Sequence, residues 1–113
     1  MEYLPVGLFA IAAIGGLTLA GMKFMGRELP MPLALGHGGF AAAGLVMLII
    51  TIVQSKINVL MYVSLLLFFL AAMGGFILFS LHLMKKAQPN WLIVVHGLSA
   101  VISSVVLLIA LLG

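Results

Sequence analysis

Four long apolar stretches, each long enough to cross a lipid bilayer as a helix, constrain this chain more than any other feature. They are Leu4–Phe24, Pro32–Val53, Val59–Leu83 and Trp91–Leu112. A helix of about 20 apolar residues rises about 30 Å, the thickness of the hydrocarbon core. Of the 113 residues, 65% are hydrophobic and only 6% are charged, too few charges for the surface of a water-soluble domain. The sequence therefore predicts an integral membrane protein with four transmembrane helices.

The connections between these stretches are short, and this determines the expected topology. They cover Met25–Met31, Gln54–Asn58 and Met84–Asn90. Because a short connection leaves the next helix antiparallel to the last, we expect an all-α, up-down-up-down four-helix bundle. Residues 1–113 would form a single transmembrane domain.

The basic residues indicate the orientation of these helices. Lys23, Arg27, Lys85 and Lys86 flank the first and third connections, whereas Lys56 lies in the second. The positive-inside rule places the first and third connections in the cytoplasm and both termini outside, on the periplasmic side. The formal charge of +3 is explained by this topology, so we expect the lipid bilayer, and no nucleic acid, as a partner.

The chain also contains an internal repeat. Shifting the sequence by 59 positions aligns residues 1–54 with 60–113 without a gap, and 17 of the 54 pairs are identical, about three times the roughly one in ten that chance would give. Each repeat unit contains two apolar stretches. The predicted bundle is thus made of two tandem two-helix repeats, whose symmetry axis lies along the membrane normal.

The repeat pairs two intramembrane histidines, His37 and His96. Each lies about 7 Å into its helix from the end next to a basic connection. In the predicted bundle the second and fourth helices lie diagonally across the central axis, so the two imidazoles would face each other at equal depth. An ionisable residue inside the membrane is by default a functional hypothesis, because burying it without a partner is costly.

The residues around the two histidines favour a flat cofactor between them. Ala41 and Gly44 share a helix face with His37, as Ala100 and Ser103 do with His96, and such small side chains would leave room for a porphyrin. Gly38 and Gly97, directly after each histidine, would let the backbone come close. The side chains expected near haem propionates at the membrane interface are His82, Lys23, Arg27, Lys85 and Lys86.

The four-helix layout and the two His-Gly steps, His37-Gly38 and His96-Gly97, resemble the small b-type membrane cytochromes. The resemblance implies a one-haem electron carrier, with His37 and His96 as axial ligands of the iron of haem b. Diheme members of that group need four ligands, and this chain has only two matched histidines. So small a chain would work beside larger subunits of a respiratory or photosynthetic complex.

Two other functions remain open from the same residues. A non-redox accessory or assembly subunit would use its histidines for hydrogen bonds between helices, and its paired glycines, such as Gly15 and Gly16, for close helix packing. A pigment-binding subunit would use each imidazole for one chlorophyll-type magnesium.

An enzyme is not expected. Ser99, Ser103 and Ser104 have no acidic partner for a triad with His96. The length also resembles the small multidrug-resistance exporters, but their intramembrane carboxylate is missing: Glu2 stands at the terminus and Glu28 in a connection.

Overall fold

A computed structural model describes residues 2–54 and 58–113, and these form four helices and no strand. The helices are α1 (Leu4–Phe24), α2 (Met31–Gln54), α3 (Val59–Leu83) and α4 (Asn90–Leu112). All four are long and apolar enough to cross a membrane. The predicted all-α fold class and the four predicted spans are confirmed, with bounds that differ by at most one residue. Lys56, assigned to the second connection, lies outside the described residues.

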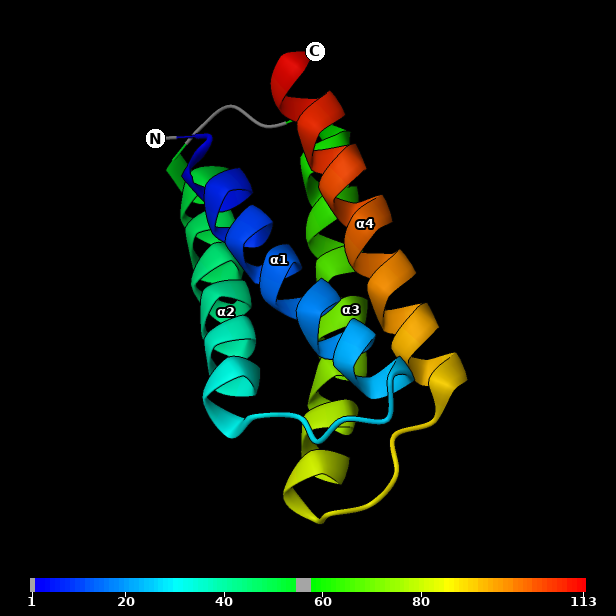
Figure 1. Cartoon of the computed structure of the whole chain (residues 1–113). Coiled ribbons are helices and arrows are strands. Elements are labelled where there is room, and N and C mark those ends of the chain that lie inside the picture. Colours follow the sequence, from blue (N-terminus) through cyan, green and yellow to red (C-terminus); the bar gives the residue numbers. More distant parts are fainter. Residues whose placement is uncertain (1, 55–57) are drawn as a thin grey trace. The chain divides into compact units, whose positions relative to one another are not determined.

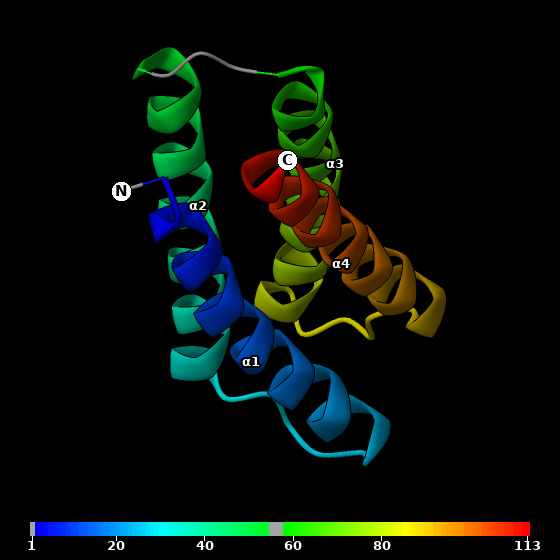
Figure 2. The same ribbon diagram turned by 90° about the horizontal axis from the view of Figure 1, so that it is seen from above.

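The chain divides into two compact units, Met1–Gln54 and Ser55–Gly113. In the first unit α1 packs against α2, and in the second α3 packs against α4. Each pair runs antiparallel and lies side by side in both views (Figure 1 and Figure 2). Each repeat of the sequence is therefore one helical hairpin, as its two apolar stretches predicted.

The core of each hairpin uses the same repeat positions. Phe9, Ala12 and Leu48 are buried in the α1–α2 hairpin, and Phe68, Ala71 and Leu107 are buried at the equivalent places in the α3–α4 hairpin. Leu48 and Leu107 are 0% and 1% exposed. Since these pairs are identical at a spacing of 59, the repeat conserves the residues on which its two helices pack.

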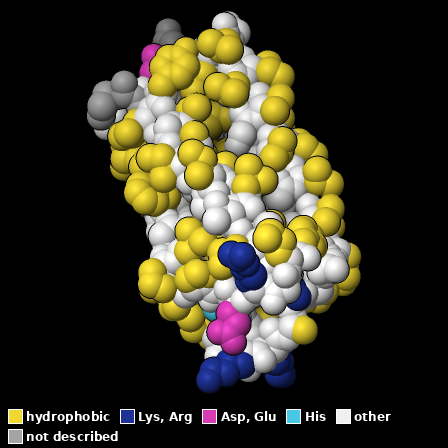
Figure 3. Space-filling model, viewed as in Figure 1, with side chains coloured by type: hydrophobic (Ala, Val, Ile, Leu, Met, Phe, Trp, Pro, Cys, Tyr) yellow, Lys and Arg dark blue, Asp and Glu magenta, His cyan; other side chains and the backbone are white. Residues whose placement is uncertain are grey.

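Most of the remaining helix surface is apolar and exposed. In each span's most apolar window only 11–22% of residues are buried within the structure. Figure 3 shows hydrophobic side chains over most of the visible face. A surface of this kind is soluble only in lipid, so the chain is a multi-pass integral membrane protein.

The helices begin and end at residues suited to those positions. A proline stands in the first turn of α1, where its missing N–H costs no hydrogen bond, and Asn58 caps α3 by accepting from the Met61 N–H over 3.1 Å. α1 ends in a Schellman turn, in which Gly26 N–H donates to Lys23 O and Arg27 N–H donates to Met22 O. Gly26 has the left-handed backbone (φ 74°) that this turn requires.

Candidate functional site

His37 lies at the α1–α2 interface and is bonded to the backbone of α1. Its Nδ1 lies 2.7 Å from the carbonyl oxygen of Ala12. Because a carbonyl only accepts, Nδ1 carries the proton and donates it. The side chain is half-buried. A histidine predicted to face a cofactor therefore joins the two helices of its own hairpin.

Two glycines of α1 make room for this imidazole. A Cβ on Gly16 would stand 2.8 Å from Cε1 of His37, closer than real contacts allow, and a Cβ on Gly15 would stand 3.4 Å from the His37 Cβ. The ring therefore occupies the space of a missing side chain. The expected role of these glycines in close packing is confirmed, and the group packed against them is the histidine.

The α3–α4 hairpin repeats this arrangement at the equivalent positions. His96 Nδ1 donates to the carbonyl oxygen of Ala71 over 2.8 Å. A Cβ on Gly75 would stand 3.0 Å from Cε1 of His96, and one on Gly74 would stand 3.6 Å from its Cβ. We call each set a histidine clasp: His37 with Ala12, Gly15 and Gly16, and His96 with Ala71, Gly74 and Gly75.

The space below the first histidine is filled within the hairpin. A Cβ on Gly44 would lie 2.9 Å from Cε1 of Phe9, so the phenyl ring takes the place that Gly44 leaves. In the second hairpin Ser103 is fully buried, and its hydroxyl donates to Ser99 O over 2.6 Å. The space predicted for a porphyrin at these two residues is taken by the neighbouring helix of the same hairpin, through Phe9 at Gly44 and through Ser64, whose hydroxyl donates to Ser103 O over 3.0 Å.

The other residues expected at a cofactor lie on different parts of the same helices. Ala41 and Ala100 are half-buried. Gly38 and Gly97 are exposed, and a Cβ on either would meet no atom within 4 Å. No close approach of the backbone in the described part of the chain therefore requires a glycine at either position.

The residues expected near propionates lie at the ends of α1 and α3 and in the turns that follow. Lys23 and His82 occupy the last helical turns and are half-buried, whereas Arg27, Lys85 and Lys86 are exposed. The His82 ring meets Phe79 edge to face, with ring centroids 6.4 Å apart. These residues form two basic turns, one in each hairpin.

Other chemical sites find no support in the described residues. Residues 2–54 and 58–113 contain no group of three or more His, Cys, Asp or Glu side chains placed to hold a metal ion. The hydroxyls of Ser103 and Ser104 donate to carbonyl oxygens four residues earlier, Ser99 O and Ala100 O. This bonding satisfies each hydroxyl within its own helix.

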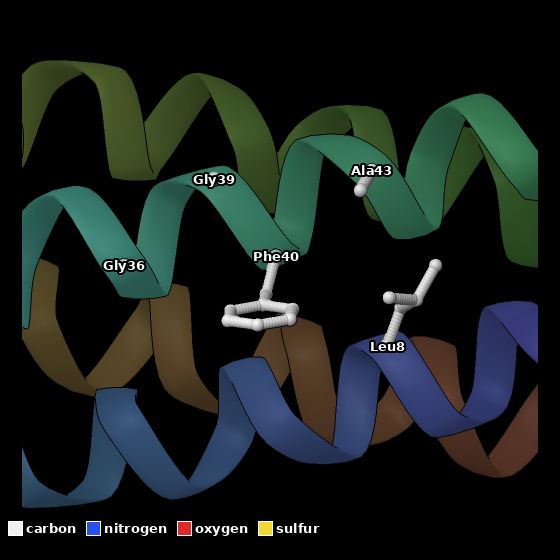
Figure 4. Close-up of a pocket in the computed structure, with 5 residues that line it drawn as sticks. All are labelled: Leu8, Gly36, Gly39, Phe40 and Ala43. Carbon is white, nitrogen blue, oxygen red and sulfur yellow. The ribbon is translucent and has the colours of Figure 1, made fainter.

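The first hairpin also has a shallow apolar groove beside α2. It is lined by Leu8, Gly36, Gly39, Phe40 and Ala43 (Figure 4). At the repeat positions of Gly36, Gly39 and Ala43 the second hairpin carries Val95, Leu98 and Ile102. The interface between the two helices of a hairpin is therefore similar in both hairpins, whereas the residues that line this groove differ.

Sequence reasoning missed the partners of the histidines, although their signal was present. Ala12, Gly15 and Gly16 are spaced at i, i+3 and i+4, so they share one helix face, and all three are identical in the repeat. Identity on one face of the first helix, opposite an identical histidine on the second, is the pattern of a contact within the hairpin.

No known protein family, curated protein or solved structure matches the chain.

Proposed function

We propose that this protein is a non-redox accessory or assembly subunit of a larger membrane complex, in which the two histidines hold each helical hairpin together. The observation that carries the proposal is the repeated histidine clasp. Each imidazole donates to a backbone carbonyl of the neighbouring helix and fills the space above a glycine. Polar side chains that bond across transmembrane helices and small residues that allow close approach are the usual means of joining helices in lipid.

The distribution of the chain between membrane and water supports the same proposal. Four spans account for nearly the whole sequence, and the described turns between them are short. Most of the exposed surface of these helices is apolar. Such surfaces contact lipid or the transmembrane helices of other subunits.

A visible absorption spectrum of the purified protein tests this function. We expect a colourless protein, with His37→Ala and His96→Ala each lowering the stability of the fold. A Soret band at one haem per chain, lost in either variant, would overturn the proposal. Absorption in the far red would overturn it in favour of a chlorophyll-type pigment.

A b-type haem protein is the second candidate, and one observation favours it. Donation from Nδ1 leaves the lone pair of each ring on Nε2, and a backbone carbonyl bound to Nδ1–H is a common way to orient a ligating histidine. The tautomer of His37 and His96 is therefore the one that axial ligation of haem iron uses. A bound haem would supply one-electron transfer, while the Ala12 and Ala71 carbonyls would hold the tautomer.

The spectrum also separates the forms of this candidate. Low-spin haem that is lost in both single alanine variants and kept in His82→Ala would support ligation by His37 and His96. Residual haem in either variant would contradict a shared ligand pair. Propionate contacts by Lys23, Arg27, Lys85, Lys86 or His82 would appear as weaker haem retention with an unchanged spectrum.

We further propose that the two basic turns face the cytoplasm and that both termini face the periplasm. The support is the concentration of Lys and Arg in these turns. The chain contains no cysteine, so a single introduced cysteine gives an unambiguous label. An impermeant thiol reagent should label Glu2→Cys in intact cells and leave Glu28→Cys unlabelled until the membrane is opened. The reverse pattern would overturn the orientation.

A further inference from the structure

Two helices of this protein end in the same backbone turn but with different residues at its critical position. α3 ends as α1 does: Lys85 N–H donates to His82 O, and Lys86 N–H donates to Leu81 O. Lys85 therefore occupies the place that Gly26 holds in the first hairpin, and its φ is 55° against 74° for Gly26. It is the one residue with a side chain at positive φ in the described part of the chain.

Lysine is not a residue that the backbone of this turn favours. A left-handed backbone brings Cβ close to the following carbonyl oxygen, so glycine is the residue that fits this position without strain. Gly26 shows that the same turn forms with glycine in this protein. A residue that keeps a strained conformation where a better one is available points to a function of its side chain.

The charges around Lys85 indicate what that function is. Lys86 follows it, and both side chains are exposed. The sequence from Asn58 to Gly113 contains no Asp or Glu, so the second hairpin has no acidic side chain to pair with these two ammonium groups. In the first hairpin, by contrast, Glu28 directly follows Arg27.

The position of the turn indicates which kind of anion the ammonium groups of Lys85 and Lys86 would bind. It follows a transmembrane helix directly, so its lysines lie at the level of the lipid headgroups. Anionic phospholipids attract basic residues next to a membrane span, and a phosphate accepts charge-assisted hydrogen bonds from ammonium groups. We propose that Lys85 and Lys86 bind the phosphate of an anionic phospholipid, and that the left-handed backbone of Lys85 is kept because it presents this pair. This binding is independent of the function proposed above.

The test compares Lys85→Gly with Lys85→Arg in phosphatidylcholine nanodiscs with and without phosphatidylglycerol. Native mass spectrometry counts the phosphatidylglycerol retained by each protein. We expect Lys85→Gly to retain it about fivefold more weakly, the effect of one lysine near an anionic surface. Lys85→Arg should bind as the wild type does, because the charge is kept. Equal retention by the wild type and Lys85→Gly would overturn the proposal.

Three controls separate this proposal from simpler explanations. Gly26→Asn changes the equivalent turn without changing charge and should leave retention unaltered; a loss equal to that of Lys85→Gly would mean that turn geometry alone is responsible. Inorganic phosphate should not replace the lipid in detergent, and replacement would overturn the lipid as ligand. Lys85→Gly should keep the wild-type orientation in cysteine labelling, because Lys86 remains. An inverted protein would show that Lys85 only sets topology.

Discussion

The hydroxyl of Ser64 donates a hydrogen bond of 3.0 Å to the carbonyl oxygen of Ser103 across the α3–α4 interface, and both residues are 0% exposed. The equivalent positions of the first hairpin are Pro5 and Gly44, which have no hydroxyl. Both hairpins use the histidine clasp, and this serine bond adds a second tie in the α3–α4 hairpin alone.

Ser64→Ala tests the strength of this second tie. Hydrogen bonds between transmembrane helices contribute about 0.6 kcal/mol on average and about 1.7 kcal/mol at most, so we expect a loss within that range. The measurement is reversible unfolding in mixed detergent micelles. Ser104→Ala is the matched control, because its hydroxyl bonds only within its own helix, to Ala100 O over 2.8 Å. An equal loss in both variants would assign the effect to hydroxyl removal in general.

Gly16→Ala and Gly75→Ala test the histidine clasps. The new methyl groups would lie 2.8 and 3.0 Å from the imidazoles, so ring and helix must move apart. Overpacking of this kind costs about 1–3 kcal/mol. Gly21→Ala, where a Cβ meets nothing within 4 Å, should be neutral or stabilising by up to about 1 kcal/mol. In a double-mutant cycle, His37→Ala should remove most of the penalty of Gly16→Ala, and additive losses would show that the two residues do not interact.

Lys85→Gly tests the strain at the end of α3. Relief of the left-handed conformation, set against the greater freedom of glycine in the unfolded chain, should stabilise the protein by about 1 kcal/mol. Lys86→Gly removes the same charge without relieving strain and should not stabilise. The measurement is again unfolding in mixed micelles, in zwitterionic detergent so that no anionic lipid contributes. A destabilised Lys85→Gly protein would mean that the lysine side chain itself supports the fold.

Asn58→Ala tests the polar contacts at the other end of the second hairpin. Asn58 accepts from Met61 N–H, and its Nδ2 donates to the carbonyl oxygen of Ala110 over 3.1 Å. Loss of an N-cap costs about 1 kcal/mol, and the bond to α4 adds to it. Asn58→Ser keeps the cap, but its side chain is too short to reach the carbonyl oxygen of Ala110. Its stability should therefore lie between that of Asn58→Ala and that of the wild type. Hydrogen exchange at the start of α3 provides the measurement.

The helix bounds were predictable because they follow from composition alone. A span ends where charge or proline appears, as at Met25–Met31, and an apolar stretch without period-2 alternation satisfies its backbone hydrogen bonds in lipid as a helix. The partners of the histidines depend instead on how the two helices are rotated against each other. If either helix were rotated by one residue, His37 would face a different neighbour. The periodicity of a single sequence does not determine this rotation. Gly44 was misread for this reason, because the sequence shows that it is small and does not show that Phe9 fills its place.

The left-handed Lys85 was hidden for a related reason. Gly26 and Lys85 share a repeat position. A lysine in a basic turn is readily interpreted as a determinant of membrane topology, and its residue type does not indicate that its backbone is left-handed. The hydrogen bonds to His82 O and Leu81 O and the positive φ of Lys85 reveal the same turn in both hairpins.

Each histidine clasp joins residues only 25 positions apart in the chain. The first of these bonds can therefore form once α2 has entered the membrane, before the rest of the polypeptide has been synthesised. Contacts between residues so near in sequence lose little chain entropy on forming. Co-translational insertion would then deliver two closed helix pairs one after the other, each with its imidazole already shielded from hydrocarbon while the next pair is still being translated.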